Sequence, residues 1–154
     1  MNMIQHLRHI STELAEMGYG IEELNPTALE PAMLRVVARD DGEPMEHVLT
    51  IGLFPDDASD GVLVQFYFEF PGLVDVSRLA EANAQILSTN RSIAVGAFNL
   101  SNDATGINYR YVLASPRAVG VPRDVMVDVM DMAIYAMETF GPTFAPFCGA
   151  DPAR

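Results

Sequence analysis

Lysine is absent from the 154-residue chain, and all nine basic residues are arginines. This absence excludes Schiff-base lysines, a P-loop lysine and a lysine general base. The 21 acidic residues outnumber the arginines and set the net charge at −12. We therefore expect no nucleic-acid or membrane partner, because anionic polymers and membrane surfaces are recognised through an excess of basic residues. The acidic composition does not exclude another protein as the partner.

Cysteine occurs only once, as Cys148, which excludes an intramolecular disulfide and a cysteine zinc cluster. Because it lies in a Pro- and Gly-containing tail with no histidine nearby in sequence, a free thiol without a role is favoured over a redox or catalytic thiol. The sequence shows neither a signal-peptide pattern nor an apolar run of roughly 20 residues. We expect a cytoplasmic protein without a cofactor.

The segment from residue 75 to residue 91 is predicted to be the helix around which the chain is organised. Asp75 suits the N-cap position because its carboxylate can accept hydrogen bonds from the amides of the first turn. One face carries mainly apolar side chains at helical spacing: Val76, Leu79, Ala80, Asn83, Ile86 and Leu87. A β-hairpin is predicted next, from strands at 92–101 and 107–113 with turn residues between them.

The remaining elements complete an α+β domain over residues 1–142. A helix is expected at 2–17, strands at 32–39, 45–54 and 62–70, and a last helix at 121–141, followed by an irregular tail at 143–154. The order is α-β-β-β-α-β-β-α. Since successive strands are joined by short turns, we predict an antiparallel sheet with helices packed mainly on one side.

Two groups of polar residues can be interpreted either as a metal site or as ordinary solvated surface. His6, His9 and Glu13 share one side of the first helix, as metal ligands would, but a polar helix face explains them better. The residues between 40 and 60 include seven acids and no arginine, yet they lack the ligand spacing of an EF-hand loop. We interpret them as solvated hairpin loops and expect no metal site.

The last helix is apolar around most of its circumference. Its polar residues form a single stripe: Asp124, Asp128, Asp131, Tyr135 and Glu138. Met126, Met130 and Met137 share one flank, and Met132 lies near the other. The methionine flank is either core or an adaptable surface for a dimer or another partner.

The helix sequence LAEANAQILSTN, the strand YRYVL and a closing helix that ends in phenylalanine resemble the YbjN-like family, whose fold is similar to that of the type III secretion chaperones. The resemblance implies a small acidic homodimer that binds an unidentified protein client and performs no chemistry. It places the dimer interface at Leu79, Ile86 and Leu87. It also implies a partner groove at Ile4, Leu7 and Ile10, to which we add the methionine flank of Met126, Met130 and Met137.

We therefore expect a non-enzymatic protein-binding module, chaperone-like or regulatory. An immunity protein or antitoxin that neutralises a basic partner is the main alternative, since acidity favours such encounters. The third alternative is an enzyme with an unrecognised carboxylate site, for example at Glu69, although the sequence contains none of the common catalytic motifs.

Overall fold

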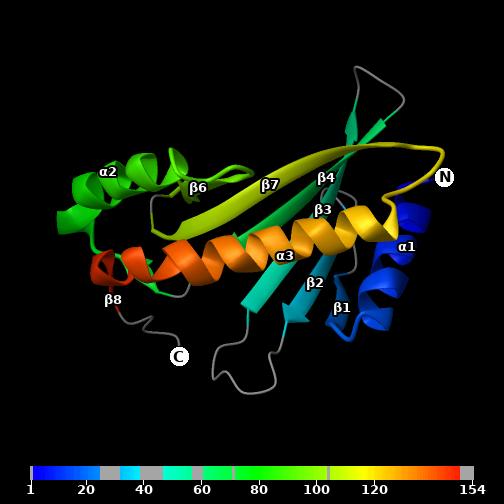
Figure 1. Ribbon diagram of the computed structural model, residues 1–154, viewed down its shortest axis with the longest axis horizontal. Helices are drawn as coiled ribbons and strands as arrows, with labels where there is room; N and C mark the ends of the chain where they lie inside the picture. Colours follow the sequence, from blue (N-terminus) through cyan, green and yellow to red (C-terminus); the bar gives the residue numbers. More distant parts are fainter. Residues whose placement is uncertain are drawn as a thin grey trace. The chain divides into compact units, whose positions relative to one another are not determined.

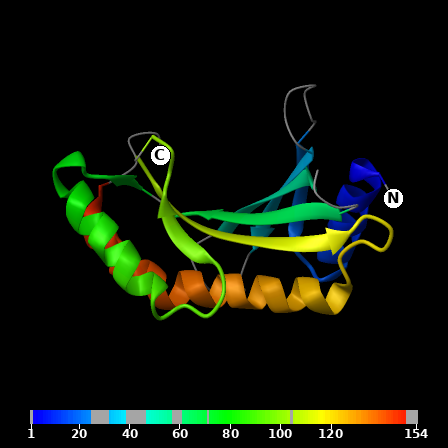
Figure 2. The same cartoon turned by 90° about the horizontal axis from the view of Figure 1, so that it is seen from above.

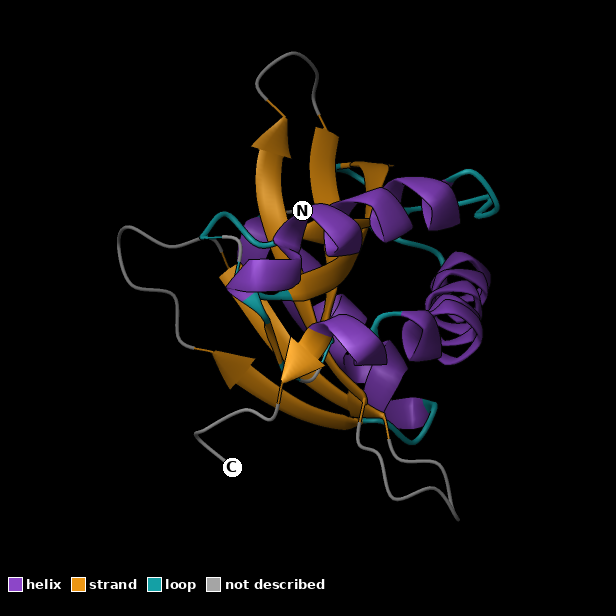
Figure 3. Ribbon diagram, turned by 90° about the vertical axis from the view of Figure 1, so that its left-hand side faces the viewer, coloured by secondary structure: helices purple, strands orange, loops and turns teal. Residues whose placement is uncertain are grey.

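A computed structural model describes residues 2–24, 32–38, 47–56, 61–70, 72–103 and 105–149 (Figure 1). Six strands form one sheet in the order β1-β2-β3-β4-β7-β6. The pairs β1–β2, β2–β3 and β6–β7 are antiparallel. Figure 3 distinguishes these strands from the helices by colour. The predicted α+β class with an antiparallel sheet is confirmed.

The elements follow one another as the sequence suggests, with short additions. The helices are α1 (Met3–Glu16), α2 (Leu79–Asn90) and α3 (Arg123–Phe140), with 3-10 turns η1 (Val76–Arg78), η2 (Gly141–Thr143) and η3 (Ala145–Phe147). The strands are β1 (Gly20–Leu24), β2 (Ala32–Ala38), β3 (His47–Asp56), β4 (Gly61–Glu69), β5 (Leu73–Val74), β6 (Ala97–Leu100), β7 (Ile107–Pro116) and β8 (Cys148–Gly149).

The chain divides into two compact units, which we describe separately. The first comprises residues 1–67 and 112–129, and the second comprises residues 68–111 and 130–154. The strands β4 and β7 and the helix α3 each continue from one unit into the other. The assignment of residues 1–142 to a single domain stays a prediction.

The first unit is built around α1, which packs against β1, β2 and β3 (Figure 2). A capping box starts the helix, since Asn2 accepts from the amide of Gln5 and the Gln5 side chain accepts from the amide of Asn2. The inward-facing strand residues are fully buried: Leu34, Val36, Leu49, Ile51, Leu53, Val62, Val64 and Phe66. Apart from the buried Gly52 and Gly61, their neighbours along each strand are half-buried or exposed, as expected for a sheet covered on one face.

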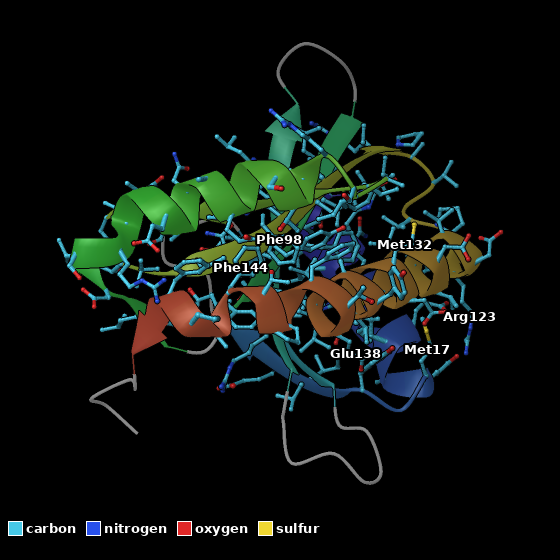
Figure 4. The ribbon with its side chains drawn as sticks, turned by 60° about the vertical axis from the view of Figure 1, so that its left-hand side comes forward. Met17, Phe98, Arg123, Met132, Glu138 and Phe144 are labelled. Carbon is cyan, nitrogen blue, oxygen red and sulfur yellow. The ribbon has the colours of Figure 1, made fainter. Side chains whose placement is uncertain are left out.

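The second unit has an aromatic core. Phe98 and Phe144 are both buried, and their ring centroids lie 4.8 Å apart (Figure 4). Tyr109 packs edge-on against Phe98 at 5.3 Å and against Phe68 at 6.4 Å. The Tyr109 hydroxyl donates to the carbonyl oxygen of Val95 at 2.7 Å, so its polar end is satisfied. Burial raises the pKa of Tyr109 to about 12, with a smaller contribution from the charge of Tyr111.

The outer edge of β6 is covered by a side chain. Asn90, the last residue of α2, accepts from the amide of Phe98 at 2.8 Å and donates to the Phe98 carbonyl oxygen at 2.9 Å. The amide group thus makes the two hydrogen bonds that a neighbouring strand would make. This arrangement protects the edge against pairing with another chain.

Three predicted segments differ from the structure. β1 is a strand where none was predicted, because a five-residue edge strand containing two glutamates has a weak strand signal. The first hairpin strand covers only Ala97–Leu100, since Gly96 adopts a left-handed backbone with φ of +72°. The tail, predicted to be irregular, contains η3 and the strand β8, in which Cys148 pairs with Val74 of β5. Residues 150–154 lie outside the described residues.

The turn between β6 and β7 makes a pH-dependent contribution to the stability of the folded protein. The side chains of Ser101 and Thr105 donate to the carboxylate of Asp103, and these bonds lower the pKa of Asp103 to about 2. An aspartate in an unfolded chain takes up its proton near pH 3.9. Folding is therefore favoured above that pH, and this contribution is lost as the pH falls from about 4 to about 2.

We expect Asp103→Asn to flatten the acid limb of the stability curve. Unfolding by urea, measured at steps between about pH 5 and about pH 2, should show a smaller loss of free energy for the variant than for the wild type. All other carboxylates are the same in both proteins, so the comparison isolates the contribution of Asp103. Identical slopes in the two proteins would contradict the assignment.

Candidate functional site

The polar residues of α1 are used to hold the connection between β7 and α3. The buried His6 donates through Nε2 to the carbonyl oxygen of Arg117 at 2.8 Å, and His9 donates through Nε2 to that of Val121 at 2.9 Å. Glu13 accepts from Arg123 at 3.1 Å. The plain interpretation as a polar helix face was therefore incomplete, because these groups make long-range contacts inside the first unit.

Most residues of the predicted partner groove are buried in this structure. Ile4 is 52% exposed, but the other five residues are buried: Leu7, Ile10, Met126, Met130 and Met137. These side chains belong to the core of the chain itself. The three methionines of this flank are therefore core residues, as one of the two predicted alternatives has it. A partner could reach them only if these side chains became exposed.

The three predicted dimer-interface residues on α2 differ in exposure, because the helix turns some of them inward and one outward. Ile86 is buried with Ala82 and Thr89, whereas Leu79 is half-buried and Leu87 is 58% exposed. The inward face of α2 is thus lined by small residues around one isoleucine. Of the three predicted interface residues, Leu87 alone is available to a partner in this arrangement.

Exposed residues on the outward face of α2, together with one residue of η1 and the residue that follows α2, form a row that we call the α2 stripe. Its members are all exposed: Val76, Ala80, Asn83, Ala84, Leu87 and Arg91. Val76 is 82% exposed, which is unusual for a β-branched apolar side chain. The intervals between successive members are four, three, one, three and four residues, so the stripe reads the same in both chain directions.

The start of α2 is held by the tail of the second unit. The Arg78 guanidinium donates to the carbonyl oxygen of Pro146 at 2.5 Å and to Glu81 at 2.8 Å, and it stacks 4.7 Å above the ring centroid of Phe147. The amide of Asp75 donates to the Phe147 carbonyl oxygen at 2.9 Å. These contacts give the α2 stripe a supported N-terminal end, and nothing in the local sequence indicated them.

The predicted polar stripe of α3 is exposed along its whole length. Asp124, Asp128, Asp131, Tyr135 and Glu138 all lie at the surface, and Met132 on the adjoining flank is 37% exposed. Glu69, the candidate acid of a carboxylate site, is exposed at the end of β4. Within the described ranges, no three His, Cys, Asp or Glu side chains are grouped so that they could hold a metal ion. No helix in the same ranges is long and apolar enough to cross a membrane.

Comparison with known proteins supports the fold. No family model matches the sequence. No curated protein sequence matches it either. Among solved structures, the chain is similar to the crystal structure of YbjN from E. coli, described as a candidate transcription regulator, with a TM-score of 0.52 and 12% identity over 87% of each chain. At this identity the likeness concerns the fold alone. The chain has a YbjN-like fold.

Proposed function

We propose that this protein is a non-enzymatic protein-binding module that acts as a homodimer in a regulatory or chaperone-like role. The α2 stripe carries the proposal, because it combines exposed apolar side chains with a spacing that suits pairing with a second copy. The regulator description of YbjN is compatible with this role. An isolated exposed leucine would need no explanation, but a symmetric row of exposed residues on one helix favours an interface.

A second copy fits the stripe in an antiparallel arrangement. A two-fold axis between residues 83 and 84 places Leu87 of one copy over Ala80 of the other, so a large side chain meets a small one on both sides of the axis. Close approach of the helices at Asn83 and Ala84 is possible because both side chains are short. Each buried leucine would contribute roughly 1.5–3 kcal/mol.

Charge also favours a second copy at this place. Two chains of net charge −12 repel one another over most of their surface. Residues 75–91, however, contain two acids and two arginines and are neutral in sum. In the antiparallel arrangement Arg91 of one copy approaches Asp75 of the other, which gives the interface an opposite-charge pair at each end.

Cross-linking across the axis tests this proposal. In a Cys148→Ser background, Ala84→Cys places one thiol per chain beside the axis, where paired helices are about 8–10 Å apart. A short bismaleimide should then give covalent dimers in high yield. Val119→Cys, at a side chain that is 67% exposed in the first unit, is the matched control and should give few. Equal yields at both positions would contradict the α2 interface.

A further inference from the structure

The exposed side of α3 is a second surface that carries both apolar and acidic side chains. We call it the α3 face and define it by its exposed residues: Asp124, Asp128, Asp131, Met132, Tyr135 and Glu138. Tyr135 is 63% exposed and Met132 is 37% exposed, and their spacing of three residues makes them neighbours on the helix. Tyrosine and methionine are residue types enriched at the centres of protein interfaces.

The charge of the α3 face is acidic and is not balanced within the helix. Arg123 is the one basic residue of α3, and it is bound to Glu16 at 2.7 Å and to Glu13 at 3.1 Å. Asp124 has a local role, because its carboxylate accepts from the amide of Val125 near the helix N-terminus. Asp128 and Asp131 lie beyond the first turn, where aspartate is a weak helix former and like charges three or four residues apart repel.

Figure 4 shows how the face is laid out. Met132 and Glu138 lie towards opposite sides of α3 in this view. By helical spacing, Tyr135 falls between them, with Asp131 and Asp128 on the preceding turns. An exposed aromatic ring and a thioether are therefore bordered by carboxylates. This is the complement of a helix that presents an apolar stripe flanked by basic residues.

We propose that the α3 face binds a basic amphipathic segment of another protein. An apolar side chain of that segment packs on Met132, an arginine stacks on the ring of Tyr135, and further basic residues pair with Asp128 and Asp131. The proposal rests on the protein-binding role given above and adds the chemical class of the partner. It is independent of the α2 stripe, which lies within the neutral segment 75–91 and is proposed to pair with a second copy.

A defined peptide tests the proposal. The probe is a helical peptide of about 15 residues with one leucine stripe flanked by arginines, and its neutral counterpart carries citrulline in place of arginine. Binding to the full chain is measured by isothermal titration calorimetry. We expect the arginine peptide to bind, more weakly as salt is raised, and the citrulline peptide to bind at least tenfold more weakly.

Two double variants of equal charge locate the site. Asp128→Asn with Asp131→Asn and Glu22→Gln with Glu69→Gln both change the net charge from −12 to −10. The first pair should weaken binding at least tenfold and the second less than twofold. Tyr135→Ser should also weaken it at least tenfold, whereas its exposed position leaves folding, followed by circular dichroism, unaffected. Equal losses in the two charge variants, or binding of the citrulline peptide with full affinity, would overturn the proposal.

The two proposals fail separately. A wild-type protein that dimerises but does not bind the arginine peptide would overturn the assignment of the α3 face and leave the homodimer standing. A protein that binds the peptide through the α3 face but remains a monomer would support this assignment and overturn the homodimer.

Discussion

Replacing Gly96 with alanine should destabilise the protein by about 3 kcal/mol or more. The new Cβ would overlap the hydroxyl group and Cζ of Tyr109 and come within 2.8 Å of its Cε2. Tyr109 is 1% exposed and held by Phe98 and Phe68, so its ring cannot move aside without loss of packing. The hydrogen bond from Tyr109 to Val95 would be disturbed as well.

Gly18→Ala is the matched control for this prediction. Gly18 also has a left-handed backbone, with φ of +93°, but an added Cβ meets no atom within 4 Å. It should therefore cost only about 1–2 kcal/mol, the conformational penalty of an alanine in this region. Urea unfolding at one fixed protein concentration gives both values. A similar decrease in the free energy of unfolding for both variants would show that the contact with Tyr109 does not contribute.

Replacing Leu87 with aspartate should raise the dissociation constant of the dimer at least about 100-fold. In the proposed dimer, the symmetric interface would lose two buried leucines and gain two carboxylates that face small apolar neighbours. The monomer should keep its fold, because Leu87 is 58% exposed in the single chain. Sedimentation equilibrium of the variant measures the change.

Val119→Asp supplies the comparison for the Leu87 variant. Val119 is 67% exposed, and the substitution adds the same charge to the first unit, whereas the α2 stripe belongs to the second. We expect its dimerisation to change less than threefold, since only general charge repulsion increases. If Val119→Asp weakened the dimer as strongly as Leu87→Asp, the loss of dimerisation would come from added charge alone. The α2 stripe would then not be the dimer interface.

Strong periodic patterns in the sequence predicted the structure well. The apolar spacing along α1 gave its bounds to within one residue at each end. The single polar stripe of α3 was identified correctly, because every other position of that helix between Arg123 and Thr139 is apolar and only one orientation buries most of them. Side-chain pattern is decisive when one face differs sharply from the rest.

The orientation of α2 could not be predicted in the same way. Its alanines fit either face, and the 3-10 turn η1 changes the phase between Val76 and Leu79. As a result, Leu87 points outward and Ala82 inward, against the predicted stripe. A helix rich in small residues carries a weak periodic signal, so tertiary packing decides which side is buried.

The contacts that join distant parts of the chain left little trace in the sequence. His6 meets a carbonyl 111 residues away, and Asn90 covers a strand edge through its own side-chain amide. Neither residue type signals its partner, because histidine and asparagine are common on exposed helix faces as well. Tyr109 and Gly96 depend on each other for the same reason: the glycine is needed only once the ring position is known.

The mass of the wild-type protein in solution tests the central claim most directly. Sedimentation equilibrium at concentrations from about 1 to about 200 µM covers weak and moderate dimers. The homodimer predicts that the mass rises from that of one chain, 16.8 kDa, towards twice that value. A mass of 16.8 kDa at every concentration would contradict it.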